Sequence, residues 1–428
     1  MNDGLDEAPP RRIRPLWTVL TVVVLLLLAC GLPAVLVAGV AGEQGGRPVL
    51  RRADATADDP ASRAARDLAA RITTVLDRQS AALLAGDLDG FLAVAEPAAH
   101  ADLRRRFAAL RALKVTTWRA EVTGLPTGIA SRPGEWRLLV RFQYCFVVPG
   151  CRPSPVLAGT RWRDDGGQPR LVAVEESKSA ETGTRPWEVS DLVAATGART
   201  VVATTPALRG KLPGLLARAE AAAKVADGYA LGGSRPDRYR VFYAGRAEWE
   251  RWYGGGRPTW TGGYAVTVGG GHHEVVLNGE GDEAGLDDLL RHELTHAASL
   301  PDQGYPGKAT WWLVEGLAEY AGAAGRSVDR YEGLPEVRRL VQGGWNGRLE
   351  GIAPADDAPA DRVGGSYGVG YLAVRHLVDR FGEQRLLDFF AAVVHERVPV
   401  ARAAEQVFGE SWTALHDECV AYVRARVS

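Results

Sequence analysis

Residues 292–296 read HELTH, and residues 312–320 read WLVEGLAEY. The apolar spacing of the first stretch and its surroundings, with a stop at Pro301, predicts a helix over Leu286–Ser299. Side chains four positions apart share one face of a helix, so His292 and His296 can bind the same metal ion. Glu293 follows the first histidine and is within reach of a water molecule at such an ion.

The second stretch offers a third ligand. A catalytic zinc site normally uses three protein ligands and leaves one position open. Glu315 follows His296 after eighteen intervening residues, enough for a loop through Pro301 and Gly307 and for the start of another helix. Its carboxylate would complete a His₂Glu set, the kind that hydrolytic zinc enzymes use.

These two stretches together resemble the gluzincin metallopeptidases, in which HExxH is followed after eighteen residues by Glu in a WLxEGxAxY phrase. The resemblance implies Zn²⁺ bound by His292, His296 and Glu315, with Glu293 as the general base. Two imidazoles satisfied inside a buried helix are the structural alternative. Glu319, one turn after Glu315, is either a hydrogen-bond partner of a ligand histidine or a solvated carboxylate.

The same resemblance implies a tyrosine that donates a hydrogen bond to the developing oxyanion. Tyr367, in the phrase Tyr-Gly-Val-Gly ahead of a helix over 371–382, fits this role, and Tyr371 is the fallback. The chain lacks the Gly-x-Met-Glu-Asn segment with which aminopeptidases of this clan bind the free amine. We expect the edge strand of the cleft over residues 274–278. His272 and His273 precede it, and we expect them in a solvated loop, with a contact to the substrate as the alternative.

The N-terminus contains a long uncharged stretch. Residues 16–41 would span about 39 Å as a helix, enough to cross a bilayer core of about 30 Å, and three arginines precede them. We expect a cytoplasmic tail over 1–15, a transmembrane helix over 16–41 and a linker over 42–60, with everything beyond extracytoplasmic. A cleaved signal peptide and a lipoprotein modified at Cys30 remain alternatives.

Cysteine usage suggests one disulfide. Cys145 and Cys151 flank a Pro-Gly turn and can close a short loop, whereas two buried thiols are the alternative. No CxxC pair occurs, which argues against a cysteine zinc ribbon or a redox motif.

The remaining pattern predicts an α+β protein in two domains. Residues 61–190 read as three helices followed by four strands. The phrases LDRQSAALLAGDLDGFLAVAEP at 76–97 and TTWRAEV at 116–122 weakly resemble the nuclear-transport-factor-2-like cone fold. Such domains hold a pocket that binds a small ligand or packs against a neighbour. Residues 200–428 read as a gluzincin metallopeptidase-like domain, mostly helical with a small sheet.

The sequence therefore predicts a membrane-anchored zinc-dependent peptidase at the cell surface, acting on a peptide or protein through a Glu-activated, zinc-bound water. A catalytically degenerate peptidase-like binding or sensor module is the alternative. Basic and acidic residues number 51 and 52, and this balance argues against a nucleic-acid partner. An intramembrane protease is disfavoured because charged residues crowd the start of the helix that carries HELTH.

Overall fold

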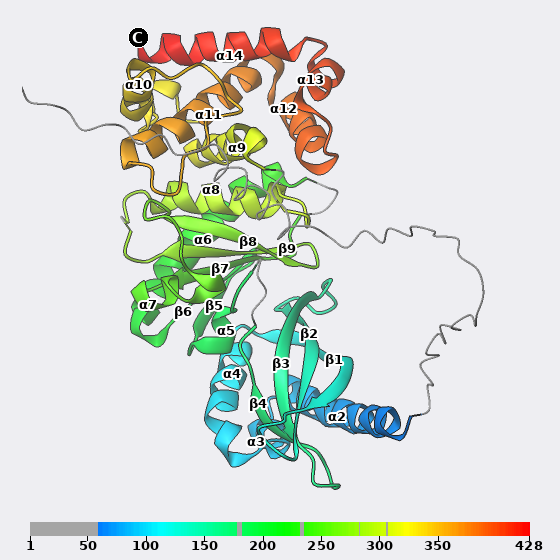
Figure 1. Ribbon diagram of the computed structural model, residues 1–428. Helices are drawn as coiled ribbons and strands as arrows, with labels where there is room; N and C mark the ends of the chain where they lie inside the picture. The colour runs from blue at the N-terminus through cyan, green and yellow to red at the C-terminus, as the bar shows by residue number, and fades with distance from the viewer. Residues whose placement is uncertain (1–58, 178–181, 232–234, 282, 305–306) are drawn as a thin grey trace, which may run out of the picture. The chain divides into compact units, whose positions relative to one another are not determined.

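The computed structural model describes residues 59–177, 182–231, 235–281, 283–304 and 307–428. Residues 58–428 form one compact unit. Figure 1 shows this unit with its two sheets and the helices that pack beside them.

The described structure does not bear out the expectation of a membrane-spanning helix, on which the expected membrane anchoring and extracytoplasmic placement rested. In the described residues, no helix is both long and apolar enough to cross a membrane. The longest of them, α2 (Pro60–Ala85), carries charged side chains along its length. Residues 16–41, Cys30 and most of the expected linker lie outside the described residues.

Three helices and an antiparallel sheet make up the first part of the unit, in the predicted order. The helices are α2, α3 (Leu88–Ala93) and α4 (His100–Ala112). The strands, paired in sequence order, are β1 (Val115–Gly128), β2 (Glu135–Phe146), β3 (Ser154–Arg163) and β4 (Arg170–Val174). The apolar side of α2, with Leu68, Ile72 and Val75 buried, packs against β1. The likeness to the cone fold stays a prediction.

The space between these helices and their sheet is almost filled. Trp118, Phe142 and Trp187 pack into it and leave a cavity of about 20 Å³. A volume of this size holds about one water molecule. The space between these helices and their sheet is therefore too small for a larger ligand.

A mixed five-stranded sheet follows. Its order is β5-β6-β7-β9-β8, in which β6, β7 and β9 are parallel and the outer strands are antiparallel. Its strands are β5 (Val193–Thr196), β6 (Thr200–Thr204), β7 (Tyr239–Ala244), β8 (Gly263–Gly269) and β9 (His272–Asn278). The sequence prediction missed β5 and β6, and it wrongly took β9 as the edge strand. Buried at nearly every position, β9 lies between β7 and β8, as expected of a strand that is covered on both faces.

Side chains alternate between the two faces of this sheet. Val202, Val241 and Val275 share one core with α6 (Leu212–Ala226) and α8 (Leu286–Ser299), while Phe242 and Val276 point the other way. That second face joins the core of the first sheet. The short helices α5 (Pro186–Val189) and α7 (Arg246–Trp249) lie near this sheet.

A helical layer covers α8 on its other side. Its helices are α9 (Trp311–Ala323), α10 (Leu334–Gln342), α11 (Ala360–Phe381), α12 (Glu383–Phe390), α13 (Val400–Phe408) and α14 (Trp412–Val427). α9 is buried on nearly all sides, since it packs against α8 and α11. The helices predicted for both diagnostic stretches are confirmed, with α8 at the predicted bounds.

Candidate metal centre

Two helices bring the two sequence stretches together. HELTH lies in the middle of α8, and WLVEGLAEY lies in α9. The helices approach closely where Gly322 of α9 faces the Asp288 carbonyl of α8, because a Cβ there would lie 3.3 Å from that oxygen. This small residue lets the carboxylates of α9 reach the imidazoles of α8.

Three potential ligand atoms converge between the helices. Glu315 Oε2 lies 3.2 Å from His292 Nε2 and 3.2 Å from His296 Nε2, and the two Nε2 atoms lie 3.1 Å apart. The imidazole rings are nearly perpendicular, with centroids 4.7 Å apart. This is one of two groups of metal-ligating side chains among the described residues, and it is the only one whose three members all have donor atoms available.

Glu319 orients the first histidine. Its Oε1 lies 3.0 Å from His292 Nδ1, while its Oε2 accepts a hydrogen bond of 2.7 Å from the hydroxyl of Tyr331. A carboxylate on Nδ1 keeps Nε2 free to act as a ligand. Tyr331 was not anticipated from the sequence, because nothing in its local pattern distinguishes it from a core aromatic residue.

Electrostatics at the cluster favour a cation. Burial alone would lower the pKa of His292, but its hydrogen bonds to Glu315 and Glu319 outweigh burial and raise it well above its ordinary value. Burial would likewise raise the pKa of Glu315, yet the two histidines hold it far below its usual range. Two imidazoles and a carboxylate in this arrangement fit the donor set that zinc prefers.

Glu293 is buried beside the cluster. Its side chain is 4% exposed, and its Oε2 has no hydrogen-bond partner among the described residues. Burial raises the pKa of this carboxyl, although the two histidines oppose the shift. The backbone of β8 closes over it, since a Cβ on Gly263 would lie 2.9 Å from Glu293 Oε1.

A cavity of about 340 Å³ opens onto these side chains. Its wall includes His292, Glu293, Glu319 and Tyr367. The ring of Tyr367 lies 5.9 Å from that of His292 and packs edge-on against Trp311. Tyr371 does not line this cavity, because its buried ring stacks on Tyr331. Both tyrosines belong to α11, whereas we expected Tyr367 ahead of that helix.

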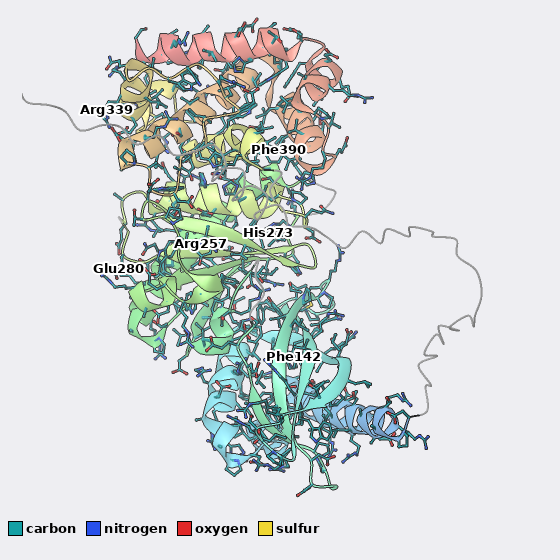
Figure 2. All side chains as sticks on the ribbon, viewed as in Figure 1. Phe142, Arg257, His273, Glu280, Arg339 and Phe390 are labelled. Atoms are coloured by element: carbon teal, nitrogen blue, oxygen red, sulfur yellow. A yellow bond between two sulfur atoms is a disulfide. The ribbon has the colours of Figure 1, made fainter. Side chains whose placement is uncertain are left out.

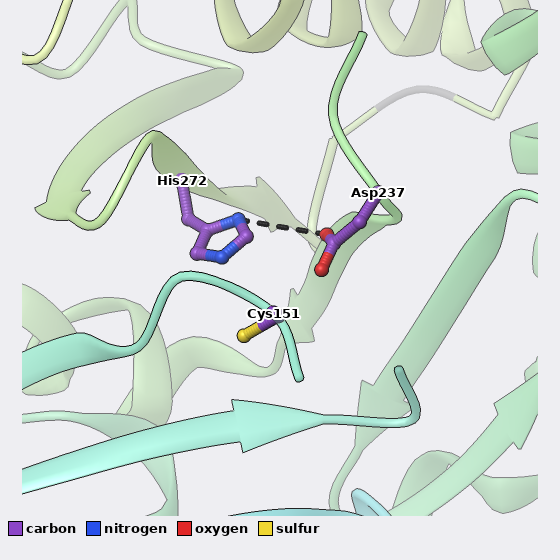
Figure 3. A group of neighbouring side chains, drawn as sticks. All are labelled: Cys151, Asp237 and His272. Carbon is purple, nitrogen blue, oxygen red and sulfur yellow. Dashed lines mark ion pairs between the residues drawn. The ribbon is translucent and has the colours of Figure 1, made fainter. Parts of the chain in front are cut away.

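His272 and His273 are buried, so the expectation of a solvated loop is wrong. They begin β9, and each is 6% exposed. His272 forms the second cluster, with Asp237 and Cys151 (Figure 3). Its Nδ1 lies 3.5 Å from Asp237 Oδ1. Cys151 is joined to Cys145 by a disulfide, with the two Cα atoms 5.9 Å apart, so this sulfur is not a thiolate ligand.

Comparisons with known proteins give distant likenesses only. No family model and no curated protein matches the chain. Native yeast LTA4 hydrolase is similar with a TM-score of 0.37 and 12% identity, over 71% of this chain and 58% of that one. The M1 zinc metallopeptidase of Deinococcus radiodurans is similar with a TM-score of 0.31 and 16% identity, over 73% of this chain and 61% of that one.

A mutant of the Deinococcus radiodurans enzyme bound to a Tyr-Ser-Ala substrate gives a TM-score of 0.32 at 16% identity, over 73% of this chain and 62% of that one. The chain thus spans about six-tenths of the length of the solved structures it matches. The assignment of the metal centre rests on the geometry of its own residues.

Proposed function

We propose that this protein is a zinc-dependent peptidase that hydrolyses peptide bonds in a peptide or protein substrate. The observation that supports this most directly is the convergence of His292, His296 and Glu315 within 3.2 Å of one another. A buried carboxylate and a cavity adjoin them. A structural role for the two histidines would not require Glu293 to be buried without a partner for Oε2 among the described residues.

In this proposal, His292, His296 and Glu315 hold Zn²⁺, and Glu319 fixes the ring of His292. The bound ion supplies a Lewis acid that makes water nucleophilic near neutral pH. Glu293 Oε2 accepts the proton of the attacking water and passes it to the leaving nitrogen of the peptide. Burial suits this carboxyl to both tasks, since it raises its pKa towards the working pH.

Tyr367 is the proposed donor to the oxyanion. It lines the cavity beside His292, and Trp311 and Trp260 hold its ring from two sides. A positioned donor of this kind typically contributes about 2.7–4 kcal/mol to the transition state.

Substitution of Glu293 separates chemistry from metal binding. Glu293→Gln should keep about one zinc per chain and lower kcat at least about a hundredfold. His292→Ala should lose both zinc and turnover. Asp287→Asn, on an exposed side chain of the same helix, is the matched control and should change neither. Zinc is measured by metal analysis after dialysis, and turnover with a fluorogenic peptide library.

Two results would contradict the proposal. One is Glu293→Gln protein that cleaves peptides at the wild-type rate. The other is wild-type protein that loads zinc but cleaves no member of the library, which would favour the catalytically degenerate binding module.

A further inference from the structure

A second and larger cavity lies alongside the outer part of β8. Its volume is about 630 Å³. The β8 segment 265–269 forms one wall, and Pro155, Val156 and Leu157 of β3 face it from the first sheet. Three arginines, Arg141, Arg185 and Arg257, also line the cavity. Arg257 is labelled in Figure 2.

Two of these arginines, Arg185 and Arg257, have buried N–H groups without a hydrogen-bond partner among the described residues. Arg185 is 3% exposed, and neither its Nε nor its Nη1 has a hydrogen-bond partner among the described residues. Arg257 Nε is buried in the same way, in the described part of the chain. The two arginines flank Tyr253: Arg185 Cζ lies 5.4 Å from its ring centroid, and Arg257 Nη2 lies 3.4 Å from its carbonyl oxygen.

The neighbouring carboxylates are already engaged with other groups. Glu274 accepts hydrogen bonds from the Tyr144 hydroxyl, from Arg240 and from the Tyr253 hydroxyl. Glu188 accepts two hydrogen bonds from Ser177 and one from the backbone N–H of Arg185.

The acidic residue in the wall of the cavity is engaged too. Asp302 accepts a hydrogen bond from the backbone N–H of Gly271, and its Oδ2 lies 3.7 Å from Arg152 Nη1. Buried donors without partners are rare in folded proteins and call for an explanation. The arginine donors therefore remain available to a ligand.

We propose that this cavity binds a carboxylate of the peptide substrate, held by Arg257 and Arg185. Paired N–H groups of guanidinium match the two oxygens of a carboxylate, and the bond is stronger because both partners are charged. This inference rests on the proposed peptidase function and names the class of its substrate: peptides with an acidic group at a fixed distance from the cleaved bond.

The course of β8 sets that distance. The strand begins at Gly263, against Glu293, and its segment 265–269 lines the arginine cavity. At about 3.3 Å per residue, the cavity extends from about 7 to about 20 Å along the strand. An extended peptide beside β8 would place there a residue about two to six positions from the cleaved bond. In the described residues, β8 pairs only with β9, so its outer edge has no strand partner.

Peptide pairs that differ only in charge test the proposal. One cleaved parent peptide is made with Glu or Gln at each of six positions on either side of the cleaved bond. It is also made with a free or an amidated C-terminus, which distinguishes a side-chain carboxylate from a terminal one. We expect one acidic position, or the free terminus, to raise kcat/KM about tenfold or more. Arg257→Ala should abolish this preference, so that the acidic and neutral members of each pair are cleaved with the same kcat/KM.

Controls and a binding measurement cover the remaining outcomes. Arg246→Ala, at a highly exposed arginine on α7, should keep the preference. The same pairs, fluorescently labelled, are titrated against zinc-loaded Glu293→Gln protein, so that affinity is measured even if no peptide is cleaved. Equal binding and cleavage of acidic and neutral peptides, or a preference retained in Arg257→Ala, would overturn the inference. Absence of cleavage with tighter acidic-peptide binding would support it and contradict only the peptidase proposal.

Discussion

Gly316 of α9 packs directly against the carbonyl group of Gly370 in α11. A Cβ on Gly316 would lie 2.4 Å from that oxygen, far closer than any side chain tolerates. Gly316 follows the proposed ligand Glu315, and Gly370 lies one turn after Tyr367. The contact between two glycines therefore sets the distance between the helix that carries the third ligand and the helix that carries the proposed oxyanion donor.

Gly316→Ala should accordingly damage both stability and the metal centre. Overpacking of a tight contact costs about 1–3 kcal/mol, and here the displaced atoms are backbone. We expect a lower free energy of unfolding by urea denaturation and weaker zinc binding by chelator competition. Gly210→Ala is the control, since its Cβ would meet nothing within 4 Å. A Gly316→Ala protein as stable as that control would show that the helices can separate without loss.

Glu319→Gln tests the hydrogen bond behind His292. Glutamine replaces the carboxylate that lies against Nδ1 of His292 with an uncharged amide. Partners that orient a metal ligand in this way typically contribute about 10- to 100-fold to metal affinity. We expect the zinc Kd to rise by that factor, measured by competition with a chromophoric chelator. Tyr331→Phe, which removes only the hydroxyl that donates to Glu319, should have a smaller effect. An unchanged Kd in Glu319→Gln would assign this carboxylate to the packing of α9 alone.

The metal cluster could be predicted because its geometry is local. Helical spacing alone sets His292 and His296 on one face of α8, and Glu315 was accessible because its phrase follows HELTH at a characteristic spacing. The disulfide was similarly accessible, because Cys145 and Cys151 lie six residues apart around a turn.

Features that depend on long-range pairing could not be predicted in this way. β5 and β6 are short, and the order of the sheet depends on parallel pairing between β6, β7 and β9. No spacing in the sequence shows that β8 rather than β9 forms the edge. The arginine cavity has the same origin, since Arg141, Arg185 and Arg257 come from three separate segments.

Removal of the disulfide should lower stability modestly. Cys145 and Cys151 close a loop of only six residues, and the entropy of closing so short a loop corresponds to about 2 kcal/mol. Cys145→Ser with Cys151→Ser should lower the unfolding free energy by about this amount and leave zinc content unchanged. Cys419→Ser, at the buried free cysteine, is the matched control for loss of a sulfur atom. Zinc loss in the double variant would link this loop to the metal centre.

His273 should make the protein sensitive to mild acid. Burial, the largest influence, lowers its pKa to about 4, from an ordinary value of about 6.5. The unfolded chain therefore binds a proton between these values while the folded chain does not, so stability is complete above about pH 6.5 and falls as the pH approaches 4. A shift of this size corresponds to about 3 kcal/mol at pH 4.

His273→Phe keeps an aromatic ring at this buried position and removes the titrating group. Between pH 7 and pH 4, we expect the free energy of unfolding of the variant to fall by about 3 kcal/mol less than that of wild type. It is measured by urea denaturation with a chelator present, so that metal release does not contribute. Parallel pH profiles for His273→Phe and wild type would mean that His273 is protonated inside the fold without cost, in conflict with its burial at the start of β9.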